Sequence, residues 1–273
     1  ATYPNTYDRE KIVRYAFTLV LAAVTAANCQ ALEEILVQAQ HREESLVEVP
    51  ISITVLDGED LQRQGMTRIE DFTALAPGLS GWEQGVSTPI YAIRGISTNS
   101  FGIGGEASVA VIVDDSYVGR INSTSLSMVD VNLVEVLRGP QGTLFGRNAT
   151  AGAIVIYNNQ PVDRFEGSYR LEAGEDHQRG GALTVNQPLL GERLMLRASA
   201  FSYRSDGDLD NRWLGENIGD EDTLGGRLAL RSVVGDFDTT LAYGYQRTNT
   251  NGLGYETLVP DLAAAGNVAP DPF

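Results

Sequence analysis

The side chains that could perform chemistry are few and far apart in this chain. It has a single cysteine, Cys29, and only two histidines, His41 and His177, at distant positions. One cysteine excludes an internal disulfide, and two distant histidines do not have the spacing of a metal site. The sequence contains no paired nucleophile and base and no cluster of metal ligands. It therefore predicts no catalytic site, no bound metal and no cofactor.

Three local patterns resemble known binding motifs, but none has the spacing or the structural context that its motif requires. Residues 102–107 follow G-x-G-x-x-A, but the next segment is typical of a strand, whereas a dinucleotide fingerprint opens a helix. Residues 139–146 are rich in glycine but lack the Gly-Lys-Ser/Thr of a phosphate loop. The acidic residues within 206–222 lack the spacing of a calcium-binding loop, which favours a solvated acidic loop.

Composition narrows the class of protein. The 273 residues include 20 Lys and Arg against 36 Asp and Glu, a net charge of -16. This charge argues against nucleic-acid binding, because phosphate neutralisation requires clustered cations. The mean hydropathy is -0.13, and no apolar run approaches the roughly 20 residues that a membrane-spanning helix needs. A helical membrane protein is excluded but a β-barrel is not, because alternating strands average to mild hydropathy.

The first 31 residues have the layout of an export signal. Lys11 and Arg14 precede a short apolar run at residues 15–27, and small residues lead on to Ala31. A basic start, a short apolar stretch and a small-residue exit are typical of a secretory signal peptide. The alternative is a buried helix, although this run is apolar all round. We predict a signal peptide over residues 1–31 and an extended segment over residues 32–48.

Residues 49–161 are predicted to form a compact α/β domain. Residues 49–56 alternate as a strand, and the following Asp57-Gly58 is a turn signal. The apolar spacing within residues 59–75, interrupted at Gly65, predicts two short helices. Further strands are expected at residues 90–94, 109–113, 133–138 and 153–157.

From residue 162 onward the pattern changes to longer alternating strands. Residues 165–173, 223–231 and 237–247 each place apolar and polar side chains on opposite faces. Residues 180–187 and 193–203 alternate less cleanly, with Met195 and Phe201 on the polar face of the second. Short and long connections largely alternate, as in outer-membrane barrels. We predict about five strands of a transmembrane barrel over residues 162–273, with a water-soluble β-sandwich as the alternative.

Several motifs occur in the order and spacing of one family. They are VPISITVL at residues 49–56, APGL at 76–79, IRGI at 93–96, VDD at 113–115 and VEVLRGPQGTLFGRNATAGAI at 134–154. Together they resemble the plug domain of TonB-dependent outer-membrane receptors. The resemblance implies an α+β plug domain followed by the first antiparallel strands of a transmembrane β-barrel. Because a plugged transporter barrel has about 22 strands, we expect the barrel to be incomplete in this chain.

One departure from the family pattern concerns a turn. Where the family usually has Val-Asp-Gly, this chain has Val113, Asp114 and Asp115. We expect an aspartate to occupy the positive-φ position of this turn, since Asp tolerates the left-handed region better than most residues do.

The resemblance also implies candidate site residues. The segment at 34–39 looks like the TonB box, which would add as a strand to a sheet edge on TonB, whereas the plainer interpretation is a disordered tail. Two plug arginines would pair with barrel glutamates and lock the plug, although arginines at strand ends are by default weak surface ion-pair formers. Apex loops of the plug would face the ligand. These residues are Glu34, Ile35, Leu36, Val37, Gln38 and Ala39 for the box, Arg94 and Arg138 for the lock, and Trp82, Gln84, Asn99 and Phe101 for the ligand loops.

By the same resemblance, the protein is expected in the outer membrane of a Gram-negative bacterium. It would import a scarce extracellular small molecule, such as a ferric siderophore, without performing chemistry. Its partners would be outer-membrane lipid, that ligand and TonB, which ExbB–ExbD would energise. The alternative from a different class is a secreted soluble β-rich protein that binds a ligand through a plug-like module.

Overall fold

The computed structural model describes residues 36–37, 44–45, 51–83, 89–98, 107–119, 128–175, 177–207, 209–211 and 216–250. The chain divides into two compact units, residues 1–49 and residues 50–273. In the first unit, strand β1 (Leu36–Val37) pairs antiparallel with strand β2 (Glu44–Ser45). The expected signal peptide, residues 1–31, lies outside the described residues.

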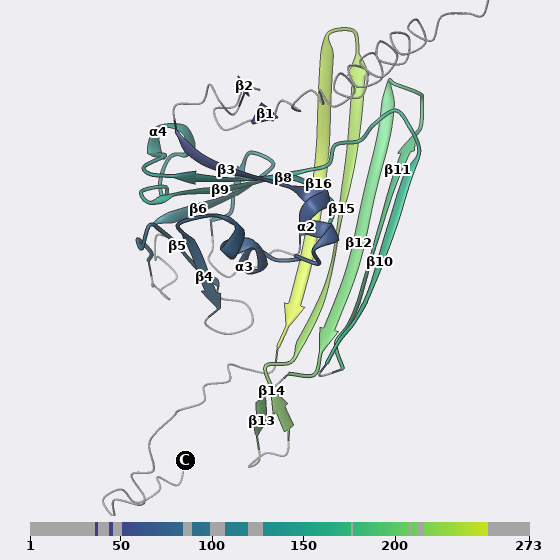
Figure 1. The fold of residues 1–273 in the computed structure, drawn as a ribbon. Helices are drawn as coiled ribbons and strands as arrows, with labels where there is room; N and C mark the ends of the chain where they lie inside the picture. Colours follow the sequence, from purple (N-terminus) through teal and green to yellow (C-terminus); the bar gives the residue numbers. More distant parts are fainter. Residues whose placement is uncertain are drawn as a thin grey trace, which may run out of the picture. The chain divides into compact units, whose positions relative to one another are not determined.

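The first half of the second unit is built on a mixed five-stranded sheet (Figure 1). Its strand order is β3-β8-β9-β6-β7, with β6 and β9 parallel and the other neighbours antiparallel. A separate hairpin joins β4 and β5. The strands are β3 (Ser52–Asp57), β4 (Leu79–Glu83), β5 (Pro89–Ile93), β6 (Val109–Val113), β7 (Ser116–Tyr117), β8 (Val131–Arg138) and β9 (Gly152–Asn158). We call these elements and the helices between them the α/β domain.

The predicted pair of short helices is confirmed, and each has a local cause. Helix α2 (Gly58–Arg63) begins where the Asp57 carboxylate accepts hydrogen bonds from the next backbone N–H groups, and it ends before Gly65, which has φ of 72°. Helix α3 (Ile69–Phe72) follows and continues into the 3₁₀ turn η1 (Thr73–Leu75). A further single-turn helix, α4 (Gly142–Phe145), was not predicted.

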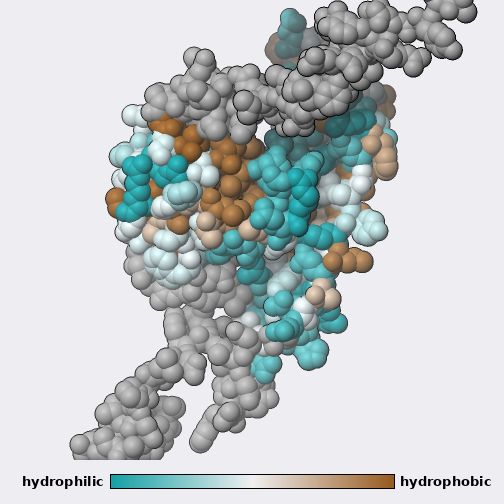
Figure 2. Space-filling model, in the orientation of Figure 1, coloured by the Kyte–Doolittle hydropathy of each residue, from teal (hydrophilic) through white to brown (hydrophobic). Residues whose placement is uncertain are grey.

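The core of the α/β domain lies between these helices and one face of its sheet. Ile69 and Phe72 of α3 are fully buried and belong to the same cluster as Val134, Val136 and Ile154 of the sheet. Strands β5, β6 and β9 are buried along nearly their whole length. Their apolar runs without alternation are typical of strands covered on both faces. In the space-filling view, hydrophobic residues of this domain show as a brown area beside hydrophilic surface (Figure 2).

The second half of the unit is an antiparallel sheet of long strands in the order β10-β11-β12-β15-β16. One face is exposed and apolar: Tyr169 and Leu171 are each 80% exposed, and Leu241 and Tyr243 are similar. The opposite face is polar and is covered on the middle strands β11, β12 and β15, with Asn186 fully buried, whereas it is exposed on most of β16. The strands are β10 (Glu166–Ala173), β11 (Arg179–Pro188), β12 (Leu194–Ser205), β15 (Glu221–Val234) and β16 (Phe237–Asn249).

Two features of this sheet were not visible in the sequence pattern. The connection between β12 and β15 contains a small hairpin of β13 (Leu209–Asn211) and β14 (Glu216–Ile218). Phe201, which interrupted the polar face of its strand, lies against Gly225 across the β12–β15 pair, since a Cβ at Gly225 would be 2.4 Å from the ring. The absence of a side chain at Gly225 therefore makes room for this ring.

Among the residues described, no helix is long and apolar enough to cross a membrane.

Candidate functional site

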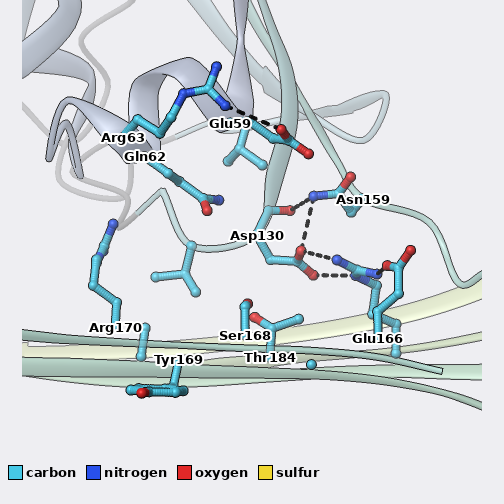
Figure 3. Close-up of a pocket in the computed structure, with 15 residues that line it drawn as sticks. Glu59, Gln62, Arg63, Asp130, Asn159, Glu166, Ser168, Tyr169, Arg170 and Thr184 are labelled. Atoms are coloured by element: carbon cyan, nitrogen blue, oxygen red, sulfur yellow. Dashed lines mark hydrogen bonds and ion pairs between the residues drawn. The ribbon is translucent and has the colours of Figure 1, made fainter.

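The most strongly bonded site joins the α/β domain to the polar face of the long sheet, and Arg197 lies at its centre. This arginine of β12 donates from Nε to Asp130 Oδ2 over 2.7 Å and from Nη2 to Asp130 Oδ1 over 2.6 Å (Figure 3). Its Nη1 donates to Glu166 Oε2 over 2.9 Å. Both Arg197 and Asp130 are buried. A two-pronged, desolvated arginine–carboxylate pair of this kind is geometrically specific.

Contacts within the α/β domain itself, independent of Arg197, fix the position of Asp130. The residue immediately precedes β8 and has φ of 63°, a left-handed conformation that Asp adopts more readily than most residues. Asn159, just after β9, donates from its backbone N–H to Asp130 O over 3.0 Å and from Nδ2 to Asp130 Oδ1 over 3.0 Å. The carboxylate is therefore preorganised by the ends of two central strands.

A second arginine, Arg227 of β15, repeats this arrangement. Its Nη2 lies 2.9 Å from Asp114 Oδ2, and its Nη1 donates to the carbonyl oxygen of Asn159 over 3.2 Å. Asp114 also accepts hydrogen bonds from the backbone and side-chain amides of Asn158, both at 2.9 Å. Asp114 and Asp115 have φ of 44° and 61°, so the expectation that aspartate fills a positive-φ position in this turn is confirmed.

The connection from the α/β domain to β10 is also fastened to the long sheet. Arg231 donates from Nη1 to the carbonyl oxygen of Pro161 over 3.3 Å. The fully buried Asn186 forms a reciprocal pair with Val162, donating to its carbonyl over 2.9 Å and accepting from its N–H over 3.0 Å. The chain therefore leaves the domain along a path fixed by side chains of β11 and β15.

In one contact the arginine belongs to the α/β domain and the carboxylate belongs to the long sheet. Arg68, just before α3, forms an ion pair with Glu221, the first residue of β15, and its guanidinium lies 5.5 Å from the ring centroid of Tyr203. The hydroxyl of the buried Thr223 donates to Glu221 Oε1 over 2.7 Å. Backbone N–H groups of Thr67 and Arg68 both donate to the Asp71 carboxylate. This contact links the base of the β12–β15 connection to the turn between α2 and α3.

A cavity of about 480 Å³ lies beside the Arg197 cluster. One wall is helix α2, with Glu59, Gln62 and Arg63, and another is formed by β10 and β11, with Ser168 and Thr184 (Figure 3). Hydrogen bonding to the Asp60 carboxylate raises the pKa of the Arg63 guanidinium above its ordinary value. Most of the residues that line the cavity are polar or charged, and Val129, Val131 and Ala182 add apolar surface.

These groups are arranged to hold the α/β domain and the long sheet together. Every arginine named above is paired with carboxylates or carbonyls. Within the described ranges there is no group of acidic, His and Cys residues that could bind a metal ion. The site is an interface stabilised by charge-assisted hydrogen bonds, which are about twice as strong as neutral ones.

The two arginines expected to form a lock lie close together within the α/β domain. A Cβ built on Gly78 would be 3.8 Å from Arg94 Cγ and 3.9 Å from Arg138 Cδ. Arg138 makes hydrogen bonds inside its own domain, to Ser52, Thr54, Ile53 and Pro77. Arg94 is exposed and has φ of 53°. Their pairing with barrel glutamates stays a prediction.

The other expected site residues are placed only in part. Leu36 and Val37 of the box form strand β1, whereas Glu34, Ile35, Gln38 and Ala39 lie outside the described residues. Trp82, expected to face the ligand, is on β4 and 44% exposed. Gln84, Asn99 and Phe101 also lie outside the described residues.

The interface residues Asp114, Asp130, Arg197, Arg227 and Glu221 were not identified from the sequence. Two signals pointed toward them. Aspartates in tight turns marked positive-φ positions, and arginines recurred on the polar face of alternating strands. Neither signal names a partner, because the paired residues are far apart in the chain.

Comparison with known proteins matches the chain to one family model and to proteins that are named as receptors. Residues 45–153 match the family model described as the TonB-dependent Receptor Plug Domain. The chain is 29% identical over 167 residues to the ferrioxamine B receptor of Salmonella typhimurium, covering 59% of this chain and 23% of that protein. It is 24% identical over 231 residues to the pesticin receptor of Yersinia pestis, covering 82% of this chain and 34% of that protein.

A solved structure extends the similarity beyond the α/β domain. The chain matches the ferric yersiniabactin uptake receptor FyuA from Yersinia pestis with a TM-score of 0.66 and 25% identity, covering 72% of this chain and 32% of that chain. The chain thus spans between about a quarter and a third of the length of these relatives.

Proposed function

We propose that this chain, which carries the plug domain and the early barrel strands of a TonB-dependent outer-membrane receptor, serves the energy-coupled uptake of a scarce ligand such as a ferric siderophore. Its α+β plug followed by an open antiparallel sheet agrees with the fold class expected from the sequence. The match to the plug-domain model supports a location in the outer membrane of a Gram-negative bacterium. Two of them are named for the iron chelates ferrioxamine B and ferric yersiniabactin, which supports an iron chelate as the ligand class.

The observation that carries the proposal is the buried ionic attachment of the plug to the strands. Arg197 and Arg227 bind plug carboxylates, and this holds the plug against the wall that it must leave or reshape for a large ligand to pass. Removing one partner of a buried ion pair costs about 3–5 kcal/mol, so contacts of this kind resist movement of the plug. A plug fastened in this way is expected to need an outside source of energy before any part of it moves. TonB, energised by ExbB–ExbD, would supply it.

A secreted soluble binding protein is disfavoured by the outer face of the sheet. Exposed apolar side chains lie on both edge strands of the sheet, Tyr169 and Leu171 on β10 and Leu241 and Tyr243 on β16, and on strands between them, with Leu183 on β11. Apolar surface of this extent is unfavourable in water but matches the lipid-facing band of an outer-membrane barrel.

The proposed division of roles follows the chain. The box at residues 34–39 would pair with a sheet edge on TonB through backbone hydrogen bonds. Trp82, Gln84, Asn99 and Phe101 would contact the ligand from the outer side. Arg94 and Arg138 would pair with glutamates of barrel strands. No bond of the ligand is made or broken, because the receptor moves its cargo intact.

Proline substitution in the box tests the coupling to TonB. Proline removes a backbone donor and fixes φ, so Leu36→Pro or Val37→Pro should prevent strand addition. In cells that express the whole receptor, iron-labelled ferrioxamine B or ferric yersiniabactin should still bind while uptake is lost. Val37→Ile keeps the strand preference and should behave as wild type. Normal uptake by both proline variants would contradict the role of the box, and failure to bind either chelate would contradict the ligand class.

A further inference from the structure

We infer that Arg138 is a positioning residue that fastens the edge strand β3, and that β3 together with α2 is the part of the plug that leaves first under load. This inference rests on the proposed function, because it assumes that TonB pulls on the chain before β3. It goes beyond that function by naming the element that moves, the residue that restrains it and the place where a passage opens.

Strand β3 is the element through which a pull from the N-terminal side enters the plug. It lies at the edge of the sheet and pairs only with β8, from Ser52 opposite Arg138 to Asp57 opposite Leu133. An edge strand has one hydrogen-bonded neighbour, so it can be removed without breaking any other strand pair.

Arg138 holds β3 at the end where the load arrives. Its Nε donates to Ser52 Oγ over 2.9 Å, its Nη1 to Thr54 Oγ1 over 2.7 Å and its Nη2 to Ile53 O over 3.2 Å. Its Nη1 also donates to Pro77 O over 2.9 Å. One side chain on β8 therefore binds three successive residues of β3 and ties them to the turn after η1.

The rest of the plug sheet is held by stronger contacts to the barrel strands. Asp130, before β8, pairs with Arg197, and Asp114, after β6, pairs with Arg227. These bonds join full charges in covered positions, whereas the Arg138 bonds end on neutral hydroxyls and carbonyls. Charge-assisted bonds with both partners ionised are the stronger class. We therefore expect β3 to separate while β8, β9 and β6 stay on the barrel wall.

Helix α2 follows β3 directly and would leave with it. Within the described residues, no hydrogen bond or ion pair joins α2 to the barrel strands, and Arg63 pairs instead with Asp60 and Glu59 of its own helix. The burial of Leu61 in the plug core resists this movement, so the helix leaves only under load. Because α2 is one wall of the 480 Å³ cavity, its departure would open that cavity along β10 and β11 (Figure 3).

Hydrogen exchange on the whole receptor in detergent tests the restraint without ligand or TonB. Amides of residues 52–57 should exchange faster than those of residues 152–158 in the wild type. Arg138→Gln should accelerate exchange at 52–57 by about tenfold or more, since several hydrogen bonds are lost, and leave 152–158 unchanged. Thr54→Val should give a smaller increase and Arg138→Lys an intermediate one. The exposed Arg147→Gln is the matched control and should change neither segment.

Two outcomes would overturn the inference. One is equal acceleration of both segments by Arg138→Gln, which would make the arginine a general stabiliser. The other is unchanged exchange at 52–57. Because this experiment uses neither ligand nor TonB, its result is independent of the uptake test.

Thiol labelling in energised cells tests the passage. A cysteine replacing Ala182 on the wall of the 480 Å³ cavity should be labelled faster when TonB is active and ferrioxamine B is supplied. A cysteine replacing Ser199, which lines a separate 330 Å³ cavity beside Arg227, should not respond. A response at Ser199→Cys as large as that at Ala182→Cys, or none at Ala182→Cys despite uptake, would contradict the predicted opening.

Discussion

Replacing Arg197 with methionine should loosen the plug more than replacing either of its partners. Arg197 is the one cation between two carboxylates, Asp130 and Glu166. Methionine fills similar volume without charge, so Arg197→Met leaves the buried Asp130 without a cation, whereas Glu166 keeps its ion pair with Arg164. Asp130→Asn removes one negative charge, leaves the Arg197–Glu166 pair intact, and keeps a residue that tolerates the φ of 63°.

The burial of the three side chains sets the magnitudes. Asp130 is 5% exposed and Arg197 about 10%, so separating them by deleting the arginine should cost about 3–5 kcal/mol. Glu166 is 33% exposed and can recover part of its hydration, which keeps the cost near the lower end. Asp130→Asn should cost about 1–3 kcal/mol, the usual loss for one hydrogen-bonded charge partner. The double variant Arg197→Met with Asp130→Asn should be more stable than Arg197→Met alone, because the buried uncompensated carboxylate is gone.

The assay is the opening free energy of the amides in residues 131–138, measured by hydrogen exchange on the whole receptor. The expected order of stability is wild type, Asp130→Asn, the double variant and Arg197→Met, from highest to lowest. Ser168→Ala, at a neighbouring position on the same cavity, is the control and should stay close to wild type. If Asp130→Asn were as damaging as Arg197→Met, or if the double variant were the least stable, the reasoning from uncompensated charge would be refuted.

Two further substitutions probe other parts of the same arrangement. Gly152→Ala should destabilise the plug by about 1–3 kcal/mol through overpacking, because a Cβ there would lie 2.2 Å from the carbonyl oxygen of Leu137, whereas Gly142→Ala, with nothing near its Cβ, should change thermal unfolding little. Arg68→Gln should lower the stability of the α2–α3 turn by about 1–3 kcal/mol, since the buried Glu221 loses its charged partner. Adding Glu221→Gln should restore part of that loss, and a purely additive double variant would show that the two residues are not coupled.

Local periodicity was enough to determine most elements of this fold. The expected strand at residues 180–187 is β11 (Arg179–Pro188), and the expected break at Gly65 separates α2 from α3. Alternation also divided the long strands into an apolar and a polar face, because a pleated strand turns successive side chains to opposite sides. Which of the two faces is exposed differs between a barrel and a sandwich, and the pattern left both open. Short elements escaped prediction: β7 and the β13–β14 hairpin have only two or three residues per strand, too few to show a period.

The partners of the interface arginines were decided by the tertiary structure alone. The resemblance suggested that plug arginines reach barrel glutamates, yet in the described interface Arg197 and Arg227 extend from the strands to plug aspartates, and only Arg68 runs in the predicted direction. Arg197 and Asp130 are 67 positions apart, and Arg227 and Asp114 are 113 apart. A local pattern records which residues are charged and which face they take. Pairing depends on how two separately formed sheets pack, and no period within one strand contains that information.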